Sequence, residues 1–125
     1  MADWDDVRRI ALALPGAEEY LTRGNRAWRA GRLFVWERPL HKREIEELGP
    51  IDAPILGARV ESEAEKLALI EEDPEVFFTT HHFDGYAIVL ARLDRIGRDR
   101  LVELVESAWA DAAPAEDVRR RFGGA

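Results

Sequence analysis

The chain has 125 residues, a formal net charge of −7 and no cysteine. Its length is that of one ordinary domain, and the lack of cysteine excludes disulfides, thiolate metal ligands and a cysteine nucleophile. No run approaches the roughly 18 apolar residues that span a bilayer, and the opening MADWDDVRRIALALPG does not have the pattern of a secretory signal. We therefore expect a single domain over residues 1–125, located in the cytoplasm and without a membrane partner.

The N-terminal part predicts a helix followed by a β-hairpin. Apolar residues at helical spacing indicate a helix over residues 4–14, capped by Asp3 and ended by Pro15-Gly16. The stretch NRAWRAGRLFVWER predicts a hairpin with its turn near Ala30-Gly31. Two registers are possible: a three-residue turn would place on one face Arg26, Trp28, Phe34 and Trp36, and a two-residue turn would instead group Trp28, Leu33 and Val35.

The remaining elements alternate between helices and short strands. We expect a long loop with a helical turn in KREIEEL, then a strand in ILGARVE. Ser62 and Glu65 fit a capping box for a helix with Leu67 and Ile70 on its apolar face, ending near Asp73-Pro74. EVFFTT and YAIVLARLD predict strands, and RDRLVELVESAWADAAP and AEDVRRRF predict helices. This order predicts an α+β fold with an antiparallel sheet and helices packed on one side.

The adjacent histidines of THHFDGY are the obvious candidate for metal or catalytic chemistry. In an extended segment His81 and His82 point to opposite faces, whereas His82 and Asp84 converge. Zinc sites normally use three or four ligands, and the remaining histidine, His41, lies in the predicted loop. Ser62 is explained as a helix cap, and no phosphate-binding glycine motif occurs. We therefore expect no catalytic residues, no metal and no cofactor.

Basic residues are concentrated around the predicted hairpin, although the whole chain is acidic. Glu37 is the one acid between Thr22 and Arg43, among seven basic residues. Because charges are screened beyond about 8 Å in physiological salt, this local excess matters more than the net charge. Arginines interleaved with aromatic residues suit phosphate contact and base stacking, and a β-ribbon can enter a DNA groove. Alternatively, the aromatic residues face the core and the arginines pair with acids.

The order and spacing of several motifs resemble the MmcQ/YjbR-like family of small bacterial proteins. The motifs are FFTTHHFDGYAIVLARLDRI followed by LVELVESAWADAAP, WDDVRRIALALPG with Glu18-Glu19, AWRAGRLFVWERPL, and ILGARV with Glu65-Lys66 and Asp73-Pro74. The resemblance implies a compact α+β fold of the double-wing type and a DNA-binding protein, with no catalytic residue or cofactor to transfer. The hairpin around Gly31 would be one wing.

The chain departs from the family's pattern in three places. His82, Gly85 and Tyr86 match a shared Pro-His-aromatic-x-Gly-Tyr signature, but His81 and Ala87 stand where the family usually has proline. The basic ending after Ala-Pro in many relatives is absent here, where Pro114 is followed by Ala115 and Glu116. Contact with DNA at that end is therefore less expected than at the hairpin.

Two functions follow from these patterns as hypotheses. The first is a DNA-binding protein that contacts phosphates of double-stranded DNA through Arg26, Trp28, Arg29, Arg32, Arg38, Lys42 and Arg43. The second is a non-enzymatic module, with a groove for a small anionic ligand or a protein segment beside His82, Asp84 and Tyr86. In either case we expect a monomer or a weak dimer.

Overall fold

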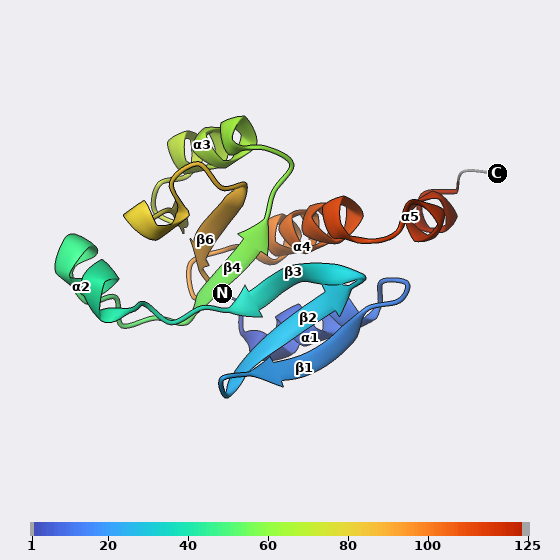
Figure 1. Ribbon diagram of the computed structural model, residues 1–125, viewed down its shortest axis with the longest axis horizontal. Coiled ribbons are helices and arrows are strands. Elements are labelled where there is room, and N and C mark those ends of the chain that lie inside the picture. Colours follow the sequence, from blue (N-terminus) through green and yellow to red (C-terminus); the bar gives the residue numbers. More distant parts are fainter. Residues whose placement is uncertain (1, 124–125) are drawn as a thin grey trace.

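The computed structural model of the chain describes residues 2–123 and consists of one antiparallel sheet with helices around it (Figure 1). Six strands lie in the order β1-β2-β3-β4-β6-β5, and every neighbouring pair is antiparallel. The strands are β1 (Glu18–Thr22), β2 (Asn25–Ala30), β3 (Arg32–Glu37), β4 (Ile55–Arg59), β5 (Phe77–Phe78) and β6 (Ile88–Arg92). The expected α+β class is confirmed.

Five α-helices and one 3-10 turn surround the sheet. They are α1 (Trp4–Leu12), α2 (Lys42–Leu48), α3 (Glu63–Glu72), the 3-10 helix η1 (His81–Phe83), α4 (Arg98–Ala112) and α5 (Ala115–Arg121). The helices α1 and α4 contact each other, and α4 also packs on β2, β3 and β4. In Figure 1 these two helices lie behind the sheet, and α2 extends sideways beyond the end of β3. Within the described residues no helix combines the length and apolar character of a membrane span.

The face of the sheet toward α1 and α4, here called the inner face, holds the main core. Paired residues on consecutive strands run across it as Trp28, Val35, Ala58 and Val89, and each is 0% exposed. Opposite them, α4 contributes Leu101, Val105, Ala108 and Trp109, which lie on one side of the helix because of its 3.6-residue period. This burial of apolar surface on both layers is the main source of stability.

The opposite, outer face of the sheet carries a second row of paired residues across all six strands. The row is Tyr20, Ala27, Trp36, Gly57, Leu90 and Phe78. A Cβ on Gly57 would lie 2.6 Å from Cε2 of Trp36, so the indole rests directly on the glycine backbone. Over β4 and β6 this face is covered by a small cluster that includes Leu40, Ile51 and Phe83. Over β1–β3 it stays accessible, with Trp36 half-buried and Arg29 exposed.

Local signals predicted most elements, but three predictions were wrong. The strand β1 was missed, because its residues are almost all exposed and lack the alternating apolar pattern. Leu67 is 54% exposed, and α3 turns Lys66 and Leu69 inward instead. The two-residue turn correctly groups Trp28 with Val35, but neither predicted register holds over the whole hairpin. Trp28 pairs with Val35 but Arg29 pairs with Leu33, so the register shifts by a β-bulge and both Phe34 and Val35 enter the core.

Candidate functional site

Two residues predicted to bind nucleic acid are buried in the fold. Trp28 is 0% exposed; its Nε1 donates to Oε1 of Glu19 at 3.0 Å, and its ring stacks on Trp4 with 6.3 Å between centroids. Arg38 is 7% exposed and donates to both carboxylate oxygens of Glu44, at 2.9 and 3.0 Å. Trp28 therefore cannot stack on a base, and Arg38 cannot reach a phosphate, without rearrangement of the core.

Two further arginines of the predicted set have structural partners. Arg26 lies on the inner face, with its guanidinium 5.9 Å from the ring centre of Trp4 and 3.9 Å from a carboxylate oxygen of Glu37. Arg32 donates through a terminal nitrogen to the carbonyl of Asp111 at 2.8 Å. That carbonyl is in the last turn of α4, where backbone oxygens lack helical partners. Arg32 thus caps α4, although its side chain is exposed.

The three remaining basic residues are accessible and face solvent. Arg29 lies on the outer face with its guanidinium 4.7 Å from the ring centre of Tyr20. Lys42 and Arg43 begin α2 and are exposed. None of the three has an ion-pair partner among the residues that the structure describes. Of the predicted basic set, these are the side chains available to an anionic partner.

A buried carboxylate that the sequence did not single out organises the start of α2. Glu44 is 3% exposed and accepts hydrogen bonds from Arg38, from the His41 backbone amide at 2.7 Å and from Oγ1 of Thr80 at 2.7 Å. Burial alone would raise the pKa of Glu44, but these hydrogen bonds outweigh it and lower the pKa to about 2. The Glu44 carboxylate therefore ties the chain after β3, through Arg38, to the segment before η1, through Thr80.

A second buried charge holds the signature segment. Lys66 is 1% exposed, and its Nζ donates to the carbonyls of Phe83 and Tyr86, both at 2.8 Å. One turn earlier on α3, Glu63 accepts a hydrogen bond from the amide of Gly85 at 2.8 Å. The two charged residues of α3 therefore fix the backbone that follows η1.

The signature residues lie differently from the prediction for an extended segment. Because residues 81–83 form a 3-10 turn, His81 and not His82 meets Asp84, with 3.1 Å between Nδ1 and Oδ2. This hydrogen bond and the nearby charge of Glu47 raise the pKa of His81. Tyr86 is 61% exposed. Of the three residues predicted for a groove, His82 lines the hollow described next, whereas Asp84 and Tyr86 do not.

A hollow does lie next to the signature, but different residues line it. It measures about 470 Å³ and is bordered by His41, Lys42, Arg43, Glu44, Glu47, His81 and His82. The rings of His41 and His82 meet edge to face, with 5.9 Å between centroids. Within residues 2–123 no group of three or more histidine, aspartate or glutamate side chains is placed to hold a metal ion. The hollow therefore combines two cations, Lys42 and Arg43, with two carboxylates and three imidazoles, and no sequence pattern placed His41 among them.

The fold and these surfaces define a small α+β domain with one accessible sheet face and a hollow lined by histidines and charged residues. The family model YjbR matches residues 12–111, and the chain belongs to the YjbR family. Uncharacterized proteins of Mycobacterium bovis and Mycobacterium tuberculosis are each 46% identical over 125 residues, covering 95% of this chain and 95% of theirs. The crystal structure of Deinococcus radiodurans protein DR2400, of the DUF419 domain family, superimposes with a TM-score of 0.70 at 19% identity, covering 98% of this chain and 89% of that one.

Proposed function

We propose that this protein binds nucleic acid, in particular double-stranded DNA, through the outer face of β1–β3 and the start of α2. The observation that carries the proposal is the accessible combination of Arg29 above Tyr20 and the half-buried Trp36 packed against Gly57. Arginine supplies phosphate contacts, and flat aromatic side chains supply stacking surfaces. The β2–β3 hairpin acts as one wing in this proposal, which involves no catalytic step. Binding to a bacterial chromosome would place the protein in the cytoplasm.

The spacing of the accessible cations suits a nucleic-acid backbone. Arg29 lies opposite Leu33 near one end of β3, and Lys42 and Arg43 follow its other end. Six strand residues span roughly 20 Å, and each DNA strand carries one phosphate per 3.4 Å of helix axis. Cations at both ends can therefore contact separate phosphates of one duplex. The net charge of −7 disfavours non-specific binding of nucleic acid to the rest of the protein surface.

We expect binding that is lost with salt and with these three charges. Fluorescence anisotropy of a labelled mixed-sequence duplex is measured at 50 and 200 mM salt, with a single strand of equal length as a second arm. If Arg29, Lys42 and Arg43 neutralise three phosphates, affinity falls roughly 40-fold between the two salt concentrations. The variant Arg29→Glu, Lys42→Glu, Arg43→Glu should lose this binding while its thermal unfolding stays unchanged.

The control for this experiment is Arg95→Glu, compared with Arg29→Glu alone. Arg95 is an exposed turn residue between β6 and α4, so its reversal changes the net charge equally but away from β1–β3. Arg32 is left intact because it caps α4. Absence of binding at 50 mM salt, or an equal loss in both single variants, would contradict the proposal.

The histidine-lined hollow supports a second candidate, a small phosphate-bearing ligand. Lys42 and Arg43 border it together with three imidazoles. Of its two bordering carboxylates, Glu44 is paired with Arg38, and Glu47 lies 3.8 Å from Nε2 of His81. Pyrophosphate at about 100 times its dissociation constant should stabilise the protein by roughly 2.7 kcal/mol in thermal unfolding. Binding should be tighter at about pH 6 than at about pH 8, because the hydrogen bond to Asp84 and the charge of Glu47 raise the pKa of His81 and favour its charged form at the lower pH.

Variants separate this candidate from nucleic-acid binding, because only Lys42 and Arg43 belong to both sites. His82→Ala should weaken pyrophosphate binding and leave duplex binding unchanged, whereas Arg29→Glu should do the reverse. Stabilisation by pyrophosphate that persists undiminished in His82→Ala would show that the anion does not occupy the hollow.

A further inference from the structure

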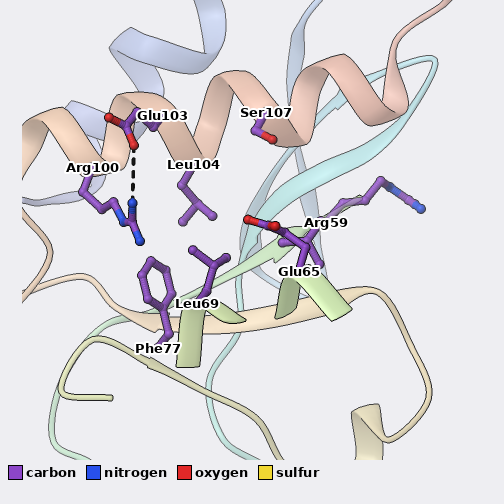
Figure 2. Close-up of a pocket in the computed structure, with 9 residues that line it drawn as sticks. Arg59, Glu65, Leu69, Phe77, Arg100, Glu103, Leu104 and Ser107 are labelled. Carbon is purple, nitrogen blue, oxygen red and sulfur yellow. Dashed lines mark hydrogen bonds and ion pairs between the residues drawn. The ribbon is translucent and has the colours of Figure 1, made fainter. Parts of the chain in front are cut away.

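A smaller pocket lies on the other side of the fold, between α3 and α4. It measures about 150 Å³, and its apolar wall is formed by Val60, Leu69, Phe77 and Leu104. Figure 2 shows Leu69 of α3 and Leu104 of α4 facing each other across it, with Phe77 beside Leu69. A cavity of this size accommodates a molecule about as large as benzene. The pocket can therefore hold a small apolar group.

One end of the pocket is bordered by an arginine, Arg100, whose positive charge is already paired with carboxylates of the same chain. Arg100 donates to Glu72 at 2.9 Å and to Glu103 at 3.4 Å, and its guanidinium lies 5.5 Å from the ring centre of Phe77. Two carboxylates and an aromatic face thus share this guanidinium. It offers little to a further anion, so the pocket is poorly suited to a carboxylate or phosphate at this end.

The other end of the pocket is acidic and has unused acceptors. Glu65 of α3 and Ser107 of α4 line it, and within residues 2–123 neither side chain has a hydrogen bond or an ion pair. One turn beyond Ser107, Oδ2 of Asp111 is buried without a partner. Burial raises the pKa of Asp111, and the charges of Glu61 and Glu65 act in the same direction. Glu65 and Ser107 therefore offer acceptors at this end for a donor that no described side chain supplies, and the Asp111 carboxylate lies one turn farther along α4 without lining the pocket.

A cation, Arg59, also lines this end of the pocket, but its guanidinium is directed away from the apolar wall (Figure 2). Nε of Arg59 donates to the carbonyl of Leu33 at 3.1 Å, which directs the side chain toward β3. Figure 2 shows its guanidinium pointing away from the apolar wall. Arg59 therefore partly offsets the negative charge of Glu65, but it does not occupy the space between Glu65 and Ser107.

We propose that the pocket between α3 and α4 binds a small primary ammonium ion with a short apolar stem. An ammonium group carries three donors and no acceptor, which matches the carboxylate of Glu65 and the hydroxyl of Ser107. The apolar stem of the ligand lies between Leu69 and Leu104, where it displaces water from their apolar surface. An anion of the same size lacks donors for these acceptors and meets the repulsion of Glu65. This ligand class is independent of nucleic-acid binding on the outer face.

The probe is n-butylammonium, compared with butyrate and n-butanol by ¹H–¹⁵N NMR titration of the full chain. Butylammonium should shift the amide signals of residues around Glu65, Leu69 and Ser107 and bind more tightly than both comparison molecules. Glu65→Gln, an exposed position where unfolding is not expected, should weaken butylammonium binding roughly threefold or more while leaving n-butanol unaffected. Glu71→Gln, another exposed carboxylate of α3, is the matched control and should have no effect.

Several outcomes of this titration would overturn the proposal. They are equal affinity for butyrate and butylammonium, signal changes that map outside the pocket, the absence of signal changes up to tens of millimolar probe, and unchanged affinity in Glu65→Gln. Ser107→Ala provides an additional test, because it removes the second acceptor without altering the charge. Loss of duplex binding in the hairpin variants would not bear on these outcomes, so the two proposals fail separately.

Discussion

Replacing Glu44 with alanine should lower the free energy of unfolding by about 3–5 kcal/mol, the range for breaking a buried ion pair by removing one partner. The carboxylate has four hydrogen bonds, two of them from Arg38, which is itself 7% exposed. Without Glu44 the guanidinium of Arg38 remains in the interior without its counter-charge. The remaining carbonyl of Pro39, 2.6 Å from Arg38, cannot compensate for that charge.

The same ion pair predicts how stability depends on pH. The pKa of Glu44 is about 2 in the folded protein and 4.5 in the reference state. Because the folded-state pKa is the lower one, the carboxylate contributes its full stability above about pH 4.5 and loses it as the pH falls through about 2. At 1.36 kcal/mol per pKa unit, this contribution is roughly 3 kcal/mol. The Glu44→Ala variant should therefore lose less stability on acidification than the parent protein.

Urea unfolding at about pH 7 and about pH 3 measures both effects. Glu46→Ala is the control, since Glu46 is an exposed residue of the same helix and should change stability by less than about 0.5 kcal/mol. The double variant Arg38→Met, Glu44→Leu should recover much of the loss, because an apolar pair of similar volume removes both buried charges together. If Glu44→Ala proved no less stable than Glu46→Ala, the ion pair would not be an important contact in solution.

The sequence predicted the helices and their caps because those signals are local. Asp3 accepts a hydrogen bond from the amide of Asp6, and Ser62 accepts one from the amide of Glu65, as expected for residues at helix starts. The second bond of the predicted capping box, from the Ser62 amide to the Glu65 carboxylate, is not formed. Gly31 has a φ of +76°, which explains why the hairpin turn could be located at a glycine. Each of these contacts lies within a few residues along the chain, so composition and spacing were sufficient to predict it.

The candidate site could not be predicted in the same way, because it depends on the register of a bulged hairpin. Trp28 and Trp36 have similar sequence surroundings, yet Trp28 is buried on the inner face and Trp36 lies on the outer face over Gly57. A register shift of one residue turns the side chains of a strand to the opposite face of the sheet. The β-bulge introduces such a shift between Trp28 and Arg29. The sequence therefore predicted an aromatic and basic hairpin correctly but not which aromatic residue faces solvent.

Buried charges were the second source of error. Arg38 was assigned to a nucleic-acid surface, and Glu44 and Lys66 were assigned no role, because charged residues are rarely fully buried. The partner of Arg38 is six residues away, whereas the carbonyls that accept from Lys66 are seventeen and twenty residues away. No periodic pattern connects positions at these separations. The contacts of Arg38 and Lys66 form because α2, α3 and η1 pack together, so they can be identified only in the folded structure.

Replacing Lys66 with methionine should lower the free energy of unfolding by about 2–4 kcal/mol. Methionine keeps the apolar stem of the side chain but leaves the carbonyls of Phe83 and Tyr86 without their donor, at roughly 1–3 kcal/mol for each buried acceptor. Both bonds are 2.8 Å long, and the ammonium is otherwise enclosed. The segment 81–86 should also become more mobile. Among the described side chains of α3, the remaining bond to this segment would be the one that the Glu63 carboxylate accepts from the Gly85 amide.

Urea unfolding gives the change in stability, and native-state hydrogen exchange at Phe83, Asp84 and Tyr86 reports whether the loss is local. The control is Lys42→Met, since Lys42 is exposed and the chain has no other lysine besides Lys66. The two variants change the net charge equally, so a difference between them comes from the buried hydrogen bonds. Equal stabilities, with unchanged exchange at these amides, would mean that the bonds from Lys66 contribute no net stability. A large global loss without faster local exchange would instead show that Lys66 supports the whole domain through the α3 packing rather than the signature segment alone.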